Sequence, residues 1–173
     1  MAFSCLPETK ESFFWFSTGK VTADFMVDRL EDSLPAFKER CPQLQTLVIN
    51  ADNGPESSGR RTQFLKRMVD FADGIGKTVQ LLYFPPYHSK YNPVERCWGI
   101  LEQHWNGAKL VDAETMLEWA KSMTWKGIKP IVTLSRKTYA KGVSLSKAAM
   151  REVEARLERN PALPKWDILI RPA

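Results

Sequence analysis

The chain has 173 residues, 43% of them hydrophobic, and a formal net charge of +5 from 25 lysine and arginine residues and 20 acidic residues. This composition indicates a globular protein of ordinary domain size, and its mild basic excess suits a polyanionic partner without requiring one. The three cysteines, Cys5, Cys41 and Cys97, are odd in number and widely spaced, which argues against a disulfide framework or a zinc site.

The first two thirds of the chain alternate between strand and helix patterns. Short apolar or aromatic runs predict the strands, and apolar residues at helical spacing predict the helices. Thr22 is the expected N-cap of the first helix, which Pro35 should kink or split. We expect the second strand to be the best buried one. The predicted strands are 12–17, 44–50 and 78–84, and the predicted helices are 22–40, 64–76 and 93–107.

The pattern is less regular beyond Gly107. Helical spacing and short apolar runs alternate there too, but prolines interrupt the tail. The predicted elements are a helix at 112–123, a strand at 130–134, a charged helix at 146–159 and a strand at 166–170.

Strands that alternate with helices imply an α/β fold with a parallel sheet, because parallel neighbours need crossover connections. Functional groups in such sheets gather at the carboxyl ends of the strands. No apolar run approaches the ~18 residues of a membrane span, and no signal-peptide pattern opens the chain. We therefore expect a cytoplasmic protein without a membrane partner.

Two carboxylates follow neighbouring predicted strands. Asp52 comes directly after the strand at 44–50, although Asp-Asn-Gly is also an ordinary turn sequence. Glu95 follows the strand at 78–84 after a loop, and it also fits a capping box with Asn92 as N-cap and Pro93 as the first helical residue. Convergent carboxylates can hold a divalent cation through oxygen ligands, so a metal site and two local structural roles both stay open.

The residues around these acids resemble a known family. The segment "VINADNG", followed 43 positions after its Asp by the Glu of "FPPYHSKYNPVE", resembles the second and third acidic positions of the DDE transposases of insertion sequences. The surrounding sequence is more similar still to that of ISAzo-type insertion-sequence transposases. The likeness includes "PIVTLSRKTYAKGVSLSKAAM" and "PKWDILIRP", so it covers most of the chain.

The resemblance implies an RNase H-like fold, shared with retroviral integrases, that cleaves DNA strands and transfers them to a target. It implies a two-ion site for Mg²⁺ or Mn²⁺ in the complete domain, with Asp52 and Glu95 as metal-binding catalytic residues. The implied partners are the DNA of the element ends and of the target, and a homo-oligomer or a full-length transposase. The implied location is the cytoplasm, in association with the nucleoid.

One family feature has no counterpart in this chain. The family's first catalytic Asp lies on an early strand, whereas Asp24, Asp28 and Asp32 fall within a predicted helix. We therefore expect an N-terminally truncated RNase H-like domain over residues 1–110, inactive alone, and a C-terminal α+β extension over residues 111–173. Two alternatives stay open: an RNase H-like nuclease, and a non-catalytic remnant that binds DNA or oligomerises.

Basic residues near the two acids are candidate DNA contacts. Solvated surface positions explain Lys90 and Arg96 equally well, and they are the favoured explanation for Arg60, Arg61 and His88. Trp98 and Trp105 share the apolar face of a predicted helix, which favours core packing over stacking on bases. The candidate DNA-binding residues are Arg60, Arg61, His88, Lys90 and Arg96.

Overall fold

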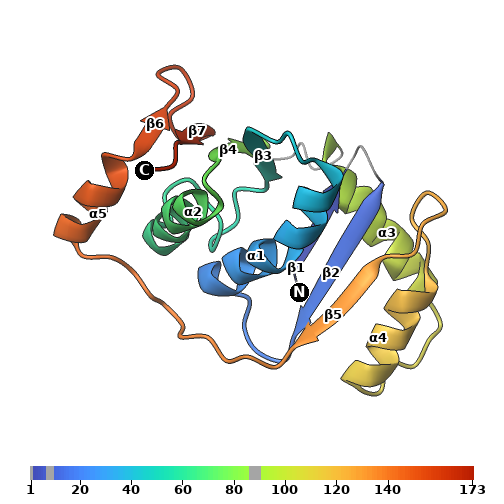
Figure 1. Ribbon diagram of the computed structural model, residues 1–173. Coiled ribbons are helices and arrows are strands. Elements are labelled where there is room, and N and C mark those ends of the chain that lie inside the picture. Colours follow the sequence, from blue (N-terminus) through green and yellow to red (C-terminus); the bar gives the residue numbers. More distant parts are fainter. Residues whose placement is uncertain (1, 7–9, 86–90) are drawn as a thin grey trace. The chain divides into compact units, whose positions relative to one another are not determined.

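The protein is described here from a computed structural model, which covers residues 2–6, 10–85 and 91–173 (Figure 1). The expected α/β class is confirmed, and most predicted elements are present within a few residues. The described strands are β1 (Ala2–Leu6), β2 (Glu11–Ser17), β3 (Thr46–Ala51), β4 (Thr78–Tyr83), β5 (Ile131–Ser135), β6 (Leu157–Arg159) and β7 (Asp167–Ile170). The described helices are α1 (Ala23–Arg40), α2 (Thr62–Ile75), α3 (Pro93–Trp105), α4 (Ala113–Ser122) and α5 (Lys147–Glu154).

The strands of the described residues form two sheets rather than the one parallel sheet that the alternation predicts. One sheet has the order β1-β2-β5, and the other has the order β3-β4-β7-β6. Pairing is parallel for β2 with β5 and for β3 with β4, and antiparallel for the other neighbours. Strand β1 was not predicted, and β6 replaces the end of the helix expected at 146–159.

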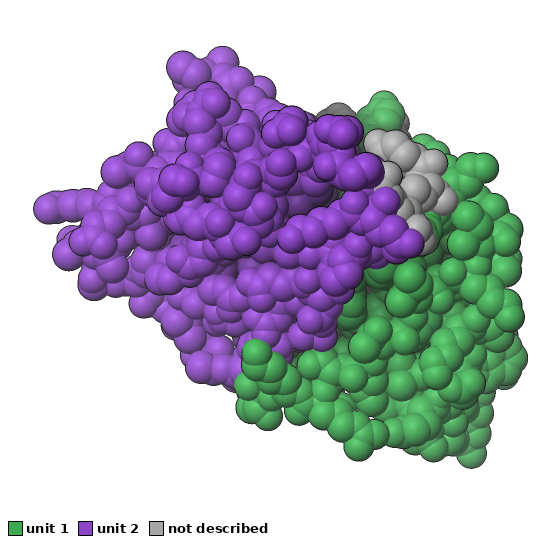
Figure 2. Space-filling model, in the orientation of Figure 1, with its two compact units in different colours: residues 1–20, 88–138 green, residues 21–87, 139–173 purple. Residues whose placement is uncertain are grey.

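The chain divides into two compact units, drawn in green and purple in Figure 2. Unit 1 contains residues 1–20 and 88–138, and unit 2 contains residues 21–87 and 139–173. Each unit is therefore built from two separate stretches of sequence around its own sheet. The predicted division into a catalytic domain over residues 1–110 and a C-terminal extension over residues 111–173 stays a prediction.

The core of unit 1 lies between its sheet and two helices. Phe14 and Phe16 point from β2 toward α3, where Cys97 and Leu101 are fully buried. Trp98 stacks on Phe14 with ring centroids 6.4 Å apart, and Trp105 packs against the same cluster. The expectation that these tryptophans serve the core is confirmed, as the helical spacing of the apolar residues required.

The core of unit 2 lies on one face of its sheet. The buried side chains of β4 alternate with half-buried ones, and Val79, Leu81 and Tyr83 face the apolar side of α2. Helix α2 ends at Gly76, which has a φ of 63° and donates its amide to the carbonyls of the last turn. The left-handed backbone there favours glycine.

Strand β3 is an exposed edge strand, so the expectation that it would be the best buried strand is wrong. Among the described strands it pairs only with β4, and its residues alternate between exposed and half-buried, with Val48 46% exposed. The opposite edge, β6, has only three residues, of which Glu158 and Arg159 are charged. Short, charged edges resist unwanted pairing, whereas β3 is six residues long and uncharged.

Helix α1 is a single helix that contains Pro35, and Thr22 caps it by accepting a hydrogen bond from the Phe25 amide at 3.3 Å. The predicted cap is therefore confirmed, while Pro35 does not split the helix. Among the described residues, no helix is long and apolar enough to cross a membrane.

Candidate functional site

Asp52 lies directly beyond the carboxyl end of β3 and is exposed. Strand β3 runs parallel to β4, with Ala51 opposite Tyr83, so the predicted adjacency of these two strands is confirmed. The carboxyl ends of neighbouring parallel strands form the edge at which α/β proteins place ligands. Asp52 therefore presents a carboxylate to solvent at this edge.

The loop that follows Asp52 folds back on it through Ser57. This buried serine donates its hydroxyl to the Asp52 backbone oxygen and to Asp52 Oδ1, at 3.3 Å each. The Tyr83 hydroxyl in turn donates to the Ser57 carbonyl at 2.8 Å. Burial raises the pKa of the Tyr83 phenol above its usual value, while Arg159 lowers it and the Asp52 charge raises it. The phenol therefore stays a donor, and the loop is held to β4.

Strands β6 and β7 hold the same loop from its other side. Arg159 donates to the Gly59 carbonyl at 3.1 Å and to the Pro164 carbonyl at 2.8 Å. A Cβ atom on Gly59 would lie 2.6 Å from the Lys165 carbonyl oxygen and 3.1 Å from Ile168 Cδ1. Only glycine allows the backbone at this position to lie so close to Lys165 and Ile168, so the loop is packed closely onto the sheet.

Gly54 leaves the Asp52 carboxylate open on one side. A Cβ atom at this position would lie 3.4 Å from Ser57 Oγ and 3.5 Å from both Asp52 carboxylate oxygens. These are ordinary contact distances, so an alanine would fit while covering part of the carboxylate. The glycine keeps the two oxygens accessible to a ligand.

Glu95 lies in the first turn of α3 and is exposed. Asn92 caps this helix by accepting a hydrogen bond from the Val94 amide at 3.2 Å, and Pro93 is the first helical residue, as predicted. Among the described residues the Glu95 carboxylate makes no hydrogen bond or ion pair, so its half of a capping box is not formed there. Its carboxylate is thus open to solvent at a helix N-terminus.

The two acids belong to different units: Asp52 to unit 2 and Glu95 to unit 1. Neither Asp52 nor Glu95 belongs to a ready ligand set, because no group of three His, Cys, Asp or Glu side chains in residues 2–6, 10–85 and 91–173 could hold a metal ion. Each carboxylate fits as one oxygen ligand for a hard divalent cation, and further ligands are needed. The pairing of Asp52 with Glu95 at one metal site stays a prediction.

The candidate DNA-binding residues have varied surroundings. Arg60 is exposed beside the Asp52 loop, and Arg61 lies 3.3 Å from Glu56 in an ion pair. Arg96 is exposed on α3. His88 and Lys90 lie outside the described residues.

The acids of α1 have a structural role. Asp24 and Asp28 accept hydrogen bonds from Arg67 of α2 at 3.1 and 2.9 Å, and Tyr139 donates to Asp28 at 2.8 Å. Burial of the Arg67 guanidinium acts to lower its pKa, but hydrogen bonds to Asp28 and Asp24 outweigh this and raise it. This network joins α1 to α2. That Asp24, Asp28 and Asp32 do not replace the family's first Asp stays a prediction.

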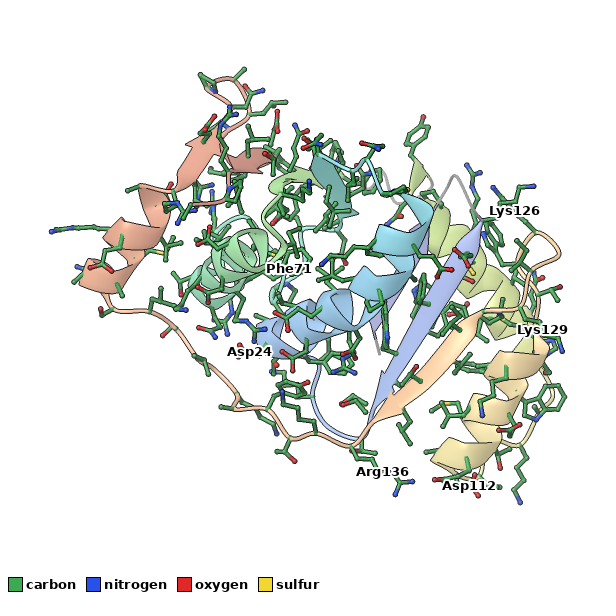
Figure 3. All side chains as sticks on the ribbon, viewed as in Figure 1. Asp24, Phe71, Asp112, Lys126, Lys129 and Arg136 are labelled. Carbon is green, nitrogen blue, oxygen red and sulfur yellow. The ribbon has the colours of Figure 1, made fainter. Side chains whose placement is uncertain are left out.

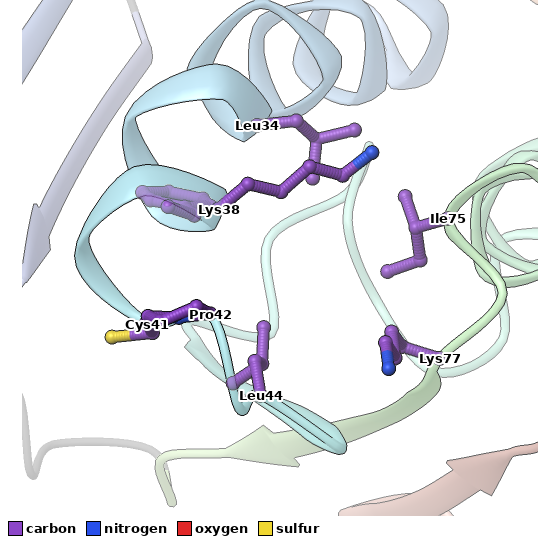
Figure 4. Close-up of a pocket in the computed structure, with 8 residues that line it drawn as sticks. Leu34, Lys38, Cys41, Pro42, Leu44, Ile75 and Lys77 are labelled. Atoms are coloured by element: carbon purple, nitrogen blue, oxygen red, sulfur yellow. The ribbon is translucent and has the colours of Figure 1, made fainter.

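A small cavity of about 70 Å³ lies at the other end of β3 and β4 (Figure 4). Leu44 and Lys77, which precede these strands, line it together with side chains of α1. No acidic side chain lines the cavity, so it does not form part of a carboxylate site. Its lining residues are Leu34, Phe37, Lys38, Cys41, Pro42, Leu44, Ile75 and Lys77.

The sequence analysis missed the side chains that hold Asp52 in place, namely Ser57, Tyr83 and Arg159. Tyr83 falls within the strand predicted at 78–84, and Arg159 within the helix predicted at 146–159. The turn-rich composition of 52–59 was the one available signal, and it indicates a loop without revealing its partners.

Comparison with known protein families gives a match over nearly the whole chain. The family model of the Rhodopirellula transposase DDE domain matches residues 4–172. Comparisons with curated proteins and with solved structures gave no significant match. Because the match spans nearly the whole chain and the acid-bearing segments at Asp52 and Glu95, the protein belongs to the family of the Rhodopirellula transposase DDE domain.

Proposed function

We propose that this chain is the larger part of a DDE catalytic domain that cleaves DNA strands and transfers them during transposition. Asp52 and Glu95 are then two of its metal-binding carboxylates. The observation that carries this proposal is the position of Asp52, which is exposed and fixed at the carboxyl end of neighbouring parallel strands in a chain of this family. The RNase H-like architecture is part of the same proposal.

The chain's own residues contribute ligands and geometry to this site. Ser57 and Tyr83 hold the Asp52 carboxylate in one orientation, and Gly54 leaves its oxygens accessible. The first turn of α3 presents Glu95 as a second oxygen donor. Bound Mg²⁺ or Mn²⁺ would supply charge stabilisation at the phosphodiester and an activated oxygen nucleophile.

The edge of β3 supports a site completed by a further strand. Its sequence, "TLVINA", is uncharged and largely apolar, which is typical of strands with neighbours on both sides. Val48 is 46% exposed at this edge, at odds with its apolar side chain. A strand paired in parallel with β3 would end beside Asp52 and could bring the family's first Asp to the site.

A second candidate function is a non-catalytic remnant that binds DNA or oligomerises. It is favoured by the sequence ahead of Asp52, where the predicted strand at 12–17 carries no Asp. The two candidates differ in one measurable property, since only the first requires metal-dependent cleavage after the domain is completed.

The test compares Mg²⁺-dependent nicking of element-end DNA by this chain and by the chain extended with its upstream coding sequence. The extended protein is expected to nick DNA, and Asp52→Asn and Glu95→Gln are expected to reduce its rate by at least about 100-fold each. Asp70→Asn on α2 and Glu102→Gln on α3 are matched controls, because both carboxylates are exposed on helices and are not among the assigned acids. Full activity of the Asp52 and Glu95 variants would refute the site assignment.

A further inference from the structure

One stretch of the chain holds a concentrated positive charge. Residues 119–151 contain eight lysine and arginine residues and no aspartate or glutamate. The formal charge of the whole chain is +5, so the remaining residues carry −3 together. A cationic stretch of this kind in a chain of low overall charge favours contact with a polyanion.

Part of this stretch forms a tight turn in unit 1. Trp125 and Ile128 exchange backbone hydrogen bonds of 2.8 and 3.0 Å, and the residues between them, Lys126 and Gly127, have φ angles of 50° and 82°. Two successive left-handed residues define a type I′ turn, in which Asn-Gly is the preferred pair. Lysine at the first of these positions costs about 1 kcal/mol relative to glycine, so folding alone does not explain Lys126.

The turn stands on a rigid base and points its lysines outward. Trp125 is 6% exposed within the core cluster of unit 1, and the Lys126 ammonium lies 5.4 Å from the centroid of its ring. Lys129 follows directly and is exposed, and Figure 3 shows Lys126 and Lys129 on the same loop between α4 and β5. Two exposed cations therefore lie three residues apart on one loop.

Acids neutralise many other cations of the protein but not these two. Arg67, Arg156 and Arg159 each pair with carboxylates, and so do Lys121 and Arg136 within the basic stretch itself. Among the described residues, neither Lys126 nor Lys129 takes part in an ion pair. Lysine ammonium groups contact phosphate oxygens as point charges, without reading base sequence.

We infer that the turn Trp125–Ile128, with Lys126 and Lys129, is a contact surface for the phosphate backbone of duplex DNA. The inference rests on the proposed function, because that function makes DNA the polyanion. It adds a surface that carries none of the proposed metal ligands. The turn holds DNA independently of base sequence while the carboxylates act on a single phosphodiester.

The test measures binding of a short fluorescent duplex by anisotropy over a series of salt concentrations. The variant Lys126→Asn/Lys129→Gln is expected to bind about tenfold more weakly. The slope of log K against log salt should become less steep, by about two. Its thermal stability should hold or rise, because Lys126→Asn creates the preferred Asn-Gly turn. The control Lys38→Gln/Lys165→Gln removes the same charge from exposed lysines of unit 2 and should change the affinity less than about twofold.

The outcomes separate this inference from the proposed function. If the turn variant binds duplex DNA with the affinity and salt slope of the wild type, the turn is not a contact surface, whatever the activity of the site. If the wild-type chain binds no duplex, the turn is not a contact surface, while nicking by the extended protein still decides the proposed function. Asp52→Asn should keep the wild-type affinity, so a loss of nicking with intact binding reports on the acidic site alone.

Discussion

Asp52 and Glu95 are both exposed carboxylates that follow neighbouring strands, but they are held in place differently. The Asp52 loop depends on residues distant in sequence, since Tyr83 and Arg159 bind its backbone and Gly59 packs on Ile168. Glu95 depends on the local start of α3, which Asn92 caps. One acid is therefore positioned by the tertiary structure and the other by its own helix, so different substitutions should disturb each of them.

The largest expected effect is that of Gly59→Ala. Its Cβ atom would lie 2.6 Å from the Lys165 carbonyl oxygen, a backbone atom that cannot move without the strand beside it. We expect the free energy of unfolding to fall by about 3 kcal/mol in urea denaturation. Gly99→Ala in α3 is the matched control: nothing lies within 4 Å of its Cβ position, so helix propensity should raise stability by up to about 1 kcal/mol. Equal stability of the two variants would contradict the close packing of the Asp52 loop.

Tyr83→Phe should have the next largest effect. It removes the 2.8 Å hydrogen bond to the Ser57 carbonyl in a buried setting and leaves that carbonyl without this donor. We expect a loss of about 1–2 kcal/mol in the free energy of unfolding and faster hydrogen exchange in the Asp52 loop, measured by mass spectrometry. Tyr91→Phe, at a tyrosine that is 60% exposed, should change stability by less than about 0.5 kcal/mol. Unchanged exchange in the loop would mean that Tyr83 does not hold it.

Asn92→Ala tests the other side of the comparison. Loss of the cap on the Val94 amide should lower stability by about 1 kcal/mol and increase exchange in the first turn of α3, while leaving the Asp52 loop protected. Asn92→Asp keeps a capping oxygen and should preserve stability. If Asn92→Ala also increased hydrogen exchange in the Asp52 loop, the positions of Asp52 and Glu95 would not depend on separate contacts.

The smallest effect concerns a tertiary contact at the surface. Asp167 of β7 accepts hydrogen bonds from Gln80 and Asn160, each 2.9 Å long, and these lower its pKa below the usual 3.8. A carboxyl group whose pKa is lower in the folded state stabilises the fold at pH values above its unfolded-state pKa. This stabilisation is lost as the pH falls through the folded-state pKa. Asp167→Asn should therefore cost at most about 0.5 kcal/mol at pH 7, with the difference from wild type shrinking below pH 4. A constant difference across that range in urea titrations would refute the assignment.

Much of the secondary structure could be predicted because its signals are local. The helix starts at Thr22 and Asn92 were identified from capping residues, and the end of α2 from Gly76. Neighbouring residues decide these features, so the sequence carries them directly. Strand β1 and the end of α5 were missed, because pairing with β2 and with β7 stabilises extended backbone there.

The candidate site was predictable in part. Asp52 was located because it directly follows an apolar run, and the start of α3 because asparagine precedes proline there. The residues that orient Asp52 could not be found from local patterns. Ser57 is in the same loop, but the donor to its carbonyl, Tyr83, comes from the next strand.

The sequence alone determined the family, the two acid-bearing segments and the boundaries of most helices, because motifs and caps depend on residues a few positions apart. The tertiary structure decided that β3 is an exposed edge, that the strands divide into two sheets, and that Arg67 is held by acids of α1. These features depend on which surfaces meet after the chain folds. An apolar run looks the same in a central strand and at an edge, and a surface cation looks the same whether or not a carboxylate from a distant helix reaches it.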